Sequence, residues 1–414
     1  MKNLKSEKGS VATLVIVTVL FFVAILSSAY MIVATLRKGQ LKNQLSVKET
    51  YEKDLSRVDE IVAEFEKVPQ IDIDTIAEEN GTINGKKPNY KNPIIPEGYK
   101  PVNEGDATWD GEEGPKINEG LVIEDANKNQ YVWIPMPTAD DVYVKTADGE
   151  EKTLIGTNVK TNIYSKSEII LEQYRTYPGD TDSSYFREPD LVVGGGSIYD
   201  AKEEYYKLIM GKDGTKASLA QFFVDEYKAM INSLTKYEGF YLGRYELSGD
   251  KENPKEQSGT VLTNTNWYEL YNACRKLAAS SAVETQMVWG CQWDIVCNWL
   301  AENGYDIVNS CSWGNYDNST GNAAVLNEKG KKAYGDKQIT GYSEFWKANN
   351  LYDLAGNCQE WTQEADSDGS DRVERGGKYS EKGDKYPVTC KEPNSPDHGA
   401  IDSRTSRAVI MVKW

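Results

Sequence analysis

The chain has 414 residues, 39% of them hydrophobic and 11% aromatic, and its formal net charge is −17. This length suits one large domain with attachments or two domains of medium size. Residues 1–67 hold 10 Lys and Arg against 8 Asp and Glu, a charge of +2, which leaves −19 for residues 68–414. Because binding to phosphates requires clustered Lys and Arg, this acidity excludes nucleic acid and anionic lipid as the main ligand of the larger part.

The N-terminal segment predicts a membrane anchor. Residues 1–9 form a short leader that contains three lysines, and residues 11–36 follow as an uncharged apolar run. A run of this length can cross the hydrocarbon core of a bilayer, about 30 Å thick, as one helix. Positive residues before such a helix favour a cytoplasmic N-terminus. We therefore expect residues 39–414 to be extracytoplasmic, at the cell membrane or on a pilus.

The same segment resembles the type IV prepilins and pseudopilins. In that family a basic leader ends at a glycine, and an apolar run then passes without a break into a polar helix. Gly9 and Ser10 stand at the corresponding junction, and the resemblance implies that a prepilin peptidase cuts between them. The family usually has glutamate at the fifth mature position, where this chain has Leu14. An uncleaved signal anchor is therefore the alternative.

A polar stalk follows the apolar run. Residues 41–67 lack proline and glycine and are rich in helix-forming residues. Apolar residues recur there at spacings of four and three, as in a coiled-coil seam: Tyr51, Leu55, Val58, Val62 and Phe65. Two such repeats fit equally well a helix that packs on its own domain. We expect residues 10–67 to form one transmembrane and stalk helix of about 85 Å, through which pilus subunits would associate.

The character of the chain changes after the stalk. Residues 68–117 are rich in proline, glycine and acidic side chains and lack helical periodicity, so they are predicted to form a linker. Two β-branched runs within residues 120–135 flank a polar turn and predict a hairpin. Residues 218–234 show the periodicity of an amphipathic helix. Regular structure is therefore expected to begin near residue 118.

Several short blocks then occur in a recognisable order. They are YVWIP (131–135), GFYLGRYE (239–246), QMVWGCQWD (286–294), SWGNYDN (312–318), GNCQEWT (356–362), RGGK (375–378) and SRAVIMV (406–412). In this order they resemble the formylglycine-generating, or sulfatase-modifying factor, family, which is a branch of the C-type-lectin-like fold. The resemblance covers residues 118–414 and implies an α+β, C-type-lectin-like domain there.

Two of these blocks have structural explanations from their residues alone. Trp361 follows a Gly-Asn turn among alternating polar positions, as expected for a large ring that anchors a short strand in the core. Gly376 and Gly377 permit positive φ and close approach of the backbone where a strand turns.

The resemblance also implies where catalysis would take place. Enzymes of the family hold Cu(I) between two cysteines after the RGG block, and these positions correspond to Glu381 and Tyr386, neither of which supplies a thiolate. Cys390 alone cannot provide two soft ligands. The other enzymatic branch of the fold uses an iron held by several histidines, and this chain has only His398. We therefore expect no enzymatic activity; a diverged modifying enzyme is the alternative.

The cysteines leave two interpretations open. All six lie in the C-terminal part, at positions 274, 291, 297, 311, 358 and 390. An even number on the outer side of a membrane suggests disulfides, but the sequence does not select a pairing. Buried free thiols are the alternative. Cys358 is expected in the core, because the family has an apolar residue at its position.

Binding is the remaining function, and the loops indicate where it would occur. Residues 310–322, 364–371 and 378–399 are rich in Tyr, Trp, Asn, Ser and Gly, which is typical of binding surfaces. The residues expected to contact a ligand are Trp313, Asn315, Tyr316, Lys378, Tyr379 and Tyr386. The carboxylates of Asp366, Asp368 and Asp371 could bind calcium, although a solvated acidic loop is the plainer explanation. No other cofactor is expected.

Together these patterns predict a membrane-anchored, pilin-like surface protein that displays a catalytically inactive C-type-lectin-like domain. Its partners would be the membrane, pilus subunits and an extracellular protein or glycan. Some members of the fold are variable proteins of diversity-generating retroelements with randomised C-terminal loops, and this chain is a candidate for the same role. A structural minor pilin or pseudopilin is the remaining alternative.

Overall fold

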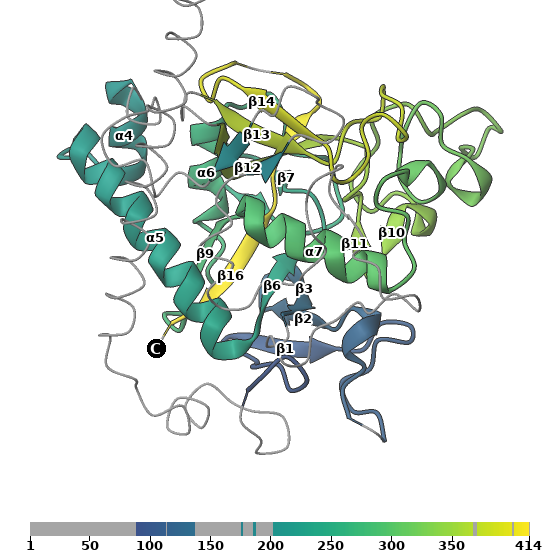
Figure 1. The fold of residues 1–414 in the computed structure, drawn as a ribbon, viewed down its shortest axis with the longest axis horizontal. Helices are drawn as coiled ribbons and strands as arrows, with labels where there is room; N and C mark the ends of the chain where they lie inside the picture. Colours follow the sequence, from purple (N-terminus) through teal and green to yellow (C-terminus); the bar gives the residue numbers. More distant parts are fainter. Residues whose placement is uncertain are drawn as a thin grey trace, which may run out of the picture. The chain divides into compact units, whose positions relative to one another are not determined.

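The computed structural model describes residues 88–112, 114–136, 175–176, 185–187, 202–366, 371–399 and 401–413. The predicted leader, the transmembrane and stalk helix, and the first part of the predicted linker lie outside these residues. Among the helices within them, none is both long and apolar enough to span a membrane. The described part of the chain is an α+β arrangement with two main sheets and a small set of helices (Figure 1).

The first sheet is antiparallel throughout. In spatial order its strands are β1 (Tyr99–Val102), β2 (Val122–Asp125), β3 (Gln130–Pro135), β6 (Gly239–Gly243), β16 (Ala408–Val412) and β9 (Val283–Met287). The last strand of the chain, β16, is inserted between β6 and β9, where Ile410 pairs with Tyr241 on one side and with Thr285 on the other. Every residue of β16 is buried. A continuous apolar run is what a strand covered on both faces requires.

The second sheet carries most of the residues that concern function. In spatial order its strands are β14 (Lys391–Asn394), β13 (Arg372–Arg375), β12 (Gln359–Asp366), β5 (Tyr185–Arg187) and β4 (Arg175–Thr176), and β15 (Arg404–Thr405) pairs in parallel with β12. Two short ribbons complete the strands, β7 (Ser248–Gly249) with β8 (Pro254–Lys255) and β10 (Lys347–Ala348) with β11 (Leu351–Tyr352).

The helices pack around and between the sheets. The α-helices are α4 (Glu203–Met210), α5 (Lys216–Tyr237), α6 (Trp267–Cys274) and α7 (Gly290–Glu302), and the short 3-10 helices are η2 (Ile117–Glu119), η6 (Ser310–Ser312), η7 (Gly321–Ala323) and η8 (Glu344–Trp346). The long helix α5 packs on β6 and β16, and α6 packs on β9. In contrast, α7 contacts both β3 and β12 and so connects the two sheets (Figure 1).

Helix α5 confirms the amphipathic helix predicted over residues 218–234. It begins at a capping box, in which the Thr215 hydroxyl accepts from the Ser218 N–H at 3.1 Å and the Ser218 hydroxyl accepts from the Thr215 N–H at 2.9 Å. It ends at Glu238, whose φ of +57° gives a left-handed cap. The predicted hairpin is confirmed too, because β2 and β3 pair antiparallel, with Val122 opposite Val132.

The predicted linker boundary is wrong for the residues between 88 and 117. Strand β1 pairs with β2 along its whole length, and Ile94 and Trp109 are buried. The Tyr241 hydroxyl donates to the Ile94 carbonyl at 2.7 Å, and the Trp109 indole donates to the Val122 carbonyl at 2.8 Å. A segment rich in proline and glycine lacks periodicity, but buried side chains can still attach it to a core through their hydrogen bonds.

The predicted core position of Trp361 is confirmed. Its side chain is fully buried in the main hydrophobic cluster, which also contains Trp267 and Ile410. Arg404 covers the ring from one side, with its guanidinium carbon 5.4 Å from the ring centroid. Trp361 therefore anchors the second sheet to a core built from elements that are distant in the sequence.

Replacement of Trp361 by alanine should unfold or nearly unfold the domain. Loss of a large buried ring costs about 3–5 kcal/mol, which is a large share of the stability of an ordinary domain. The matched control is Phe345→Ala, because Phe345 is 53% exposed and exposed substitutions usually change stability by less than about 0.5 kcal/mol. Thermal melts followed by near-UV circular dichroism would measure both. A Trp361→Ala melt equal to that of wild type would contradict this assignment of the core.

Candidate functional site

Three of the six residues predicted to contact a ligand are buried. Trp313 donates its indole N–H to the Asp306 carbonyl at 2.9 Å and packs edge-on against the ring of Tyr305. The side chains of Asn315 and Tyr316 are fully buried. The prediction that these three form exposed contacts is therefore wrong. Replacement of Trp313 is expected to destabilise the fold rather than to weaken binding alone.

Asn315 and Tyr316 instead support the loops from inside. The Asn315 side chain accepts from the Gly335 N–H at 2.9 Å and donates to the Asn357 side chain at 3.1 Å, so it joins two loops. Tyr316 donates its hydroxyl to the Gly376 carbonyl at 2.6 Å. In long irregular segments, such side chains satisfy backbone groups that helices and strands would otherwise satisfy. A loop rich in aromatic residues and asparagine can therefore be structural.

The other three predicted contacts, Lys378, Tyr379 and Tyr386, are half-buried and follow β13 closely. Gly376 and Gly377 begin this segment with φ of +86° and +67°, as predicted from the paired glycines. A Cβ atom at Gly377 would meet the Tyr386 carbonyl oxygen at 2.3 Å. Glycine therefore allows the backbone at Tyr386 to approach the start of the segment closely, and these three residues stay candidates for ligand contact.

The remaining predicted sites fall largely outside the described residues. Gly9, Ser10 and Asp368 lie outside them, as does the side chain of Asp366, whereas Asp371 is half-buried directly before β13. Within the part of the chain that the structure describes, no group of three or more Asp, Glu, His or Cys could hold a metal ion. Calcium binding by the three aspartates stays a prediction.

A mixed-charge cluster surrounds Lys378 and Tyr386. We call it the loop-face cluster, and its members are Gln359, Glu374, Lys378, Glu381, Tyr386, Glu392 and Arg404. Lys378 forms an ion pair with Glu381 at 2.9 Å and donates to Gln359 at 2.9 Å, and Gln359 donates to Glu392. Glu381 and Tyr386, which correspond to the thiol positions of the similar enzymes, thus belong to a site of oxygen and nitrogen groups.

Two glutamates oppose each other in this cluster. Glu374 on β13 lies directly opposite Glu392 on β14, and like charges in this arrangement destabilise a sheet. Arg404 approaches Glu374 to 2.7 Å, but neither oxygen of Glu374 receives a well-aligned hydrogen bond from the described residues. Burial raises the pKa of Glu374 to about 8, with Arg404 opposing the increase and Glu392 adding to it. Carboxyl groups perturbed in this way occur both at functional sites and in buried ion-pair networks.

Exposure increases from the floor of the loop-face cluster to its rim. The Glu374 side chain has no exposed surface, that of Glu381 is 14% exposed and that of Lys378 is 28% exposed. Burial and the neighbouring charge of Glu381 raise the pKa of Glu392. The charge of Glu392 in turn raises the pKa of Tyr386. Solvent thus reaches the rim, while Glu374 forms the floor.

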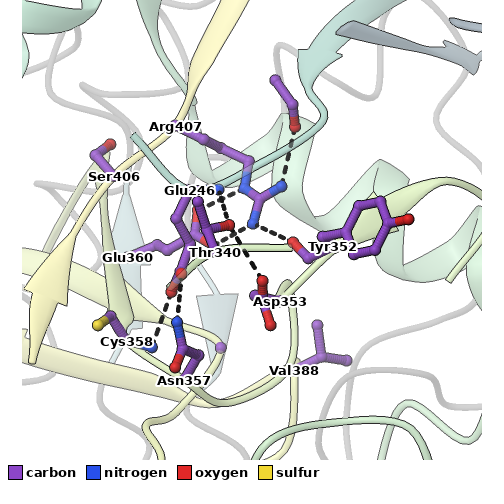
Figure 2. Close-up of polar contacts among 12 residues, drawn as sticks. Glu246, Thr340, Tyr352, Asp353, Asn357, Cys358, Glu360, Val388, Ser406 and Arg407 are labelled. Atoms are coloured by element: carbon purple, nitrogen blue, oxygen red, sulfur yellow. Dashed lines mark hydrogen bonds and ion pairs between the residues drawn. The ribbon is translucent and has the colours of Figure 1, made fainter. Parts of the chain in front are cut away.

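A second ionic cluster is closed to solvent and centres on Arg407 (Figure 2). The Arg407 guanidinium donates to both carboxylate oxygens of Glu360, at 2.6 and 2.7 Å. It also donates to the Gly243 carbonyl at 2.9 Å and to the Tyr352 carbonyl at 3.0 Å. One buried side chain therefore connects the start of β16 to β12, to the end of β6 and to β11.

Glu246 connects the same centre to the turn before β12 (Figure 2). Its carboxylate accepts from the Asn357 side chain at 2.6 Å and from the Cys358 N–H at 2.8 Å. These bonds hold Asn357 at a φ of +54°, a conformation that few residues other than glycine adopt. The GFYLGRYE block supplies Glu246, the GNCQEWT block supplies Glu360, and the SRAVIMV block supplies Arg407. Charged residues of three separate blocks are thus structural partners.

The Arg407 cluster contains more carboxyl groups than one guanidinium can neutralise. Glu246, Glu256, Asp353 and Glu360 are all buried around it. Burial is the main reason that their pKa values are raised, that of Asp353 to about 7 and those of Glu246 and Glu256 well above the ordinary range. Some of these groups therefore hold a proton at neutral pH, because several unpaired charges cannot remain in a closed interior.

Arg375, the arginine of the RGG block, belongs to a third ionic cluster, which is buried. Arg375 pairs with Asp294 on α7 and with Glu364 on β12, each at 2.8 Å, and Lys391 on β14 pairs with Glu364 at 2.6 Å. Two cations and two carboxylates balance, and all four side chains are buried. The prediction from the two glycines alone missed Arg375. The position of Arg375 between a predicted strand and two glycines was the available signal for a buried ion pair. The sequence does not show that this strand is buried.

The cysteines are buried, as the alternative to disulfides predicted. Cys274, Cys297, Cys311 and Cys358 are free thiols. Cys358 is in the core, as expected. Burial raises the pKa of each of these thiols. A thiol with a raised pKa carries little thiolate at neutral pH, so it is a weak nucleophile and a weak metal ligand.

The chain was also compared with known proteins. No family model and no curated protein matches it. Among solved structures, it is similar to Treponema denticola variable protein 1, with 16% identity over 42% of this chain and 85% of that one and a TM-score of 0.30. It is also similar to PvdO from Pseudomonas aeruginosa, with 15% identity over 42% and 82% and a TM-score of 0.26, and to CarF, with 15% identity over 42% and 87% and a TM-score of 0.30. TM-scores this low do not assign a fold.

The raised carboxyl pKa values predict that the domain is more stable at pH 5 than at pH 8. A group whose pKa is raised on folding contributes stability below its unfolded pKa, and that contribution is lost as the pH rises through the folded pKa. For Asp353 the window runs from its ordinary value of 3.8 to about 7, and for Glu374 from 4.5 to about 8. Thermal melts between pH 5 and 8 should therefore show a melting temperature that falls by several degrees.

Asp353→Asn should flatten this slope, because asparagine cannot ionise and can still accept from the Gly341 N–H, which Asp353 binds at 2.7 Å. The matched control is Asp317→Asn. Asp317 is exposed, and its pKa is lowered by its hydrogen bond to Lys332, so its contribution is lost only at more acidic pH. A melting temperature that rises from pH 5 to pH 8, or an unchanged slope in Asp353→Asn, would refute the role of the buried carboxyls.

Proposed function

We propose that the protein is a membrane-anchored surface protein whose C-terminal domain binds an extracellular ligand without catalysing a reaction. The domain would have the C-type-lectin-like fold that the order of its sequence blocks resembles. Residues 39–414 would be extracytoplasmic, at the cell membrane or on a pilus. The ligand would be a protein or a glycan, bound through the loop-face cluster and Tyr379.

The observation that carries this proposal is the character of the loop-face cluster. It offers carboxylates, an ammonium group, an amide and a phenol at half-buried positions, which suits recognition by hydrogen bonds and charge. Its floor is attached to the buried side of the second sheet, so the groups are held in place before a ligand arrives. Such preorganisation lowers the entropic cost of binding.

Two features support a site without catalysis. The positions that correspond to the copper-binding thiols hold Glu381 and Tyr386, and hard oxygen groups are poor ligands for Cu(I). Free thiols elsewhere, such as Cys297 and Cys358, are buried and have raised pKa values. Neither feature supplies the pair of accessible thiolates on which formylglycine formation depends in the family.

The purified full-length protein should not convert a sulfatase-type cysteine peptide, with or without added copper. Mass spectrometry of the peptide decides the question, because formylglycine formation changes its mass. Cys390 is the cysteine nearest in sequence to the corresponding thiol positions. Conversion of the peptide that disappears in Cys390→Ser would restore the diverged modifying enzyme as the function of this domain.

The membrane anchor should be detectable by fractionation of cells that produce the full chain. We expect the protein in the membrane or sheared-filament fraction, because residues 11–36 are uncharged and apolar. Each arginine placed at the centre of such a helix costs about 2.5–3.5 kcal/mol of insertion free energy, so Val23→Arg combined with Ile25→Arg should deplete that fraction. Leu41→Arg, beyond the apolar run, is the matched control.

The same preparation tests processing. Mass spectrometry of the mature N-terminus should find Ser10 as the first residue if a prepilin peptidase acts on the chain, and Met1 if the segment is an uncleaved anchor. Wild-type protein that stays in solution without detergent would contradict the proposed topology.

A further inference from the structure

We propose that Lys378 and Gln359 form an intramolecular isopeptide bond, which joins the lysine side-chain nitrogen to the side-chain carbonyl carbon of the glutamine. Gln359 is the first residue of β12, and Lys378 lies just after the end of β13. The bond would therefore fasten the segment after β13 to the neighbouring strand. This inference goes beyond the proposed function and does not depend on it, because the carboxylates and the phenol of the loop-face cluster stay available for a ligand.

The two reacting groups are already in contact. The Lys378 Nζ atom donates to the Gln359 side-chain oxygen at 2.9 Å, so it lies beside the carbonyl carbon that it would attack. Gln359 is buried and Lys378 is half-buried, so packing holds both side chains near this position. Two groups held together in one molecule avoid much of the entropic barrier to a reaction between them.

Lys378 also has a base within reach. An ammonium group has no free electron pair, so it must lose a proton before it can attack a carbonyl carbon. The Glu381 carboxylate is 2.9 Å from Lys378 Nζ and can take this proton. Burial lowers the pKa of Lys378, but its hydrogen bond to Glu381 raises it by more, so the net direction is upward. The uncharged amine is therefore scarce, and we expect the bond to form slowly.

The group that leaves has an acid beside it, which is a second and independent observation. The Gln359 amide nitrogen needs a proton to depart as ammonia, and this nitrogen donates to Glu392. Burial and the charge of Glu381 raise the pKa of Glu392. Glu392 also lies directly opposite Glu374, and two neighbouring carboxyls do not readily ionise together. A proton held by this pair is therefore close to the nitrogen that must accept it.

The reaction balances without any other reactant. A bond forms between Lys378 Nζ and the Gln359 carbonyl carbon, and the bond between that carbon and the amide nitrogen breaks. Nζ loses two protons in all. Glu381 takes the first, and the second replaces the proton that the pair of Glu392 and Glu374 gives to the departing nitrogen. The nitrogen leaves as ammonia, and no group is oxidised or reduced.

A second group of the same residue types lacks this arrangement. Lys128 pairs with Glu124 at 2.7 Å, and Gln130 donates to Glu124 at 2.9 Å. The Gln130 side-chain oxygen, however, accepts from Arg244 at 2.8 Å, so a guanidinium occupies the place that the lysine amine has at Gln359. We call Glu124, Lys128 and Gln130 the control cluster, and we expect no isopeptide bond in it.

The experiment is peptide mapping by mass spectrometry of the full-length protein in detergent, sampled over several days near neutral pH. A pair of tryptic peptides joined through Lys378 and Gln359 should appear, lighter than the two separate peptides by one ammonia molecule. Hydrolysis of the Gln359 amide would instead leave the peptides separate. Lys378→Arg keeps the charge but removes the amine, so the joined pair should be absent. Glu381→Gln removes the base and should slow formation of the pair about a hundredfold.

The matched control is Lys347→Arg, because Lys347 pairs with Glu344 at the same spacing along the chain as Lys378 with Glu381. It should leave the yield of joined peptides unchanged, and thermal melts should show that all variants are folded. No joined pair in the wild type, an equal yield in Glu381→Gln, or an equal yield in the control cluster would overturn the proposal. Ligand binding and membrane fractionation are separate measurements, so none of these results would bear on the proposed function.

Discussion

The ion pair between Arg407 and Glu360 is the interaction on which the rest of the described structure depends. Arg407 precedes β16 of the first sheet and Glu360 lies on β12 of the second, so their two hydrogen bonds join the sheets. The remaining donors of the guanidinium satisfy the carbonyls of Gly243 and Tyr352. A buried charge is tolerated only when its partners are complete. Loss of Arg407 would leave Glu360 as an unpaired carboxylate in the core, which is more costly than the pair is worth.

Successive side chains along a strand point to opposite faces of the sheet. This alternation explains why one face of the second sheet is closed to solvent and the other is partly open. Opposed residues share a face, so Glu360, Arg375 and Lys391 form one row across β12, β13 and β14. Trp361, Glu374 and Glu392 form the neighbouring row on the other face. The first row is buried. Asp294 and Glu364 balance its two cations, Arg375 and Lys391, and Arg407 balances Glu360. The second row begins in the core at Trp361 and ends at the half-buried Glu392.

Sequence patterns predicted the elements whose signal is local. The hairpin around the turn before β3, helix α5, the positive φ of the paired glycines and the burial of Trp361 all follow from periodicity or from residue types at fixed spacing. Local patterns predict the loop blocks less well, because Trp313, Asn315 and Tyr316 are buried. Composition cannot distinguish an aromatic residue that supports a loop from one that the loop presents, because both need a ring and a polar end.

The ionic clusters could not be predicted for a different reason. Glu246 and Arg407 are separated by 161 positions along the chain, and only the fold brings them to one centre. Charged residues are usually exposed, so a sequence gives no reason to bury Glu360 or Arg375 until the strands that carry them are known to be internal. The presence of charged residues in each of three blocks was the available signal. This pattern indicates that the three blocks interact, but it does not indicate which residues pair.

The position of the open site follows from the closed one. Glu374 and Arg375 are adjacent on β13, and their side chains point to opposite faces. Asp294 and Glu364 hold Arg375 from below, so the backbone that presents Glu374 to the loop-face cluster cannot shift without breaking a buried salt bridge. A site on a fixed strand loses little entropy when it binds. The buried ion pairs therefore serve binding indirectly, because they keep two opposed carboxyl groups in a geometry that the sheet alone would not favour.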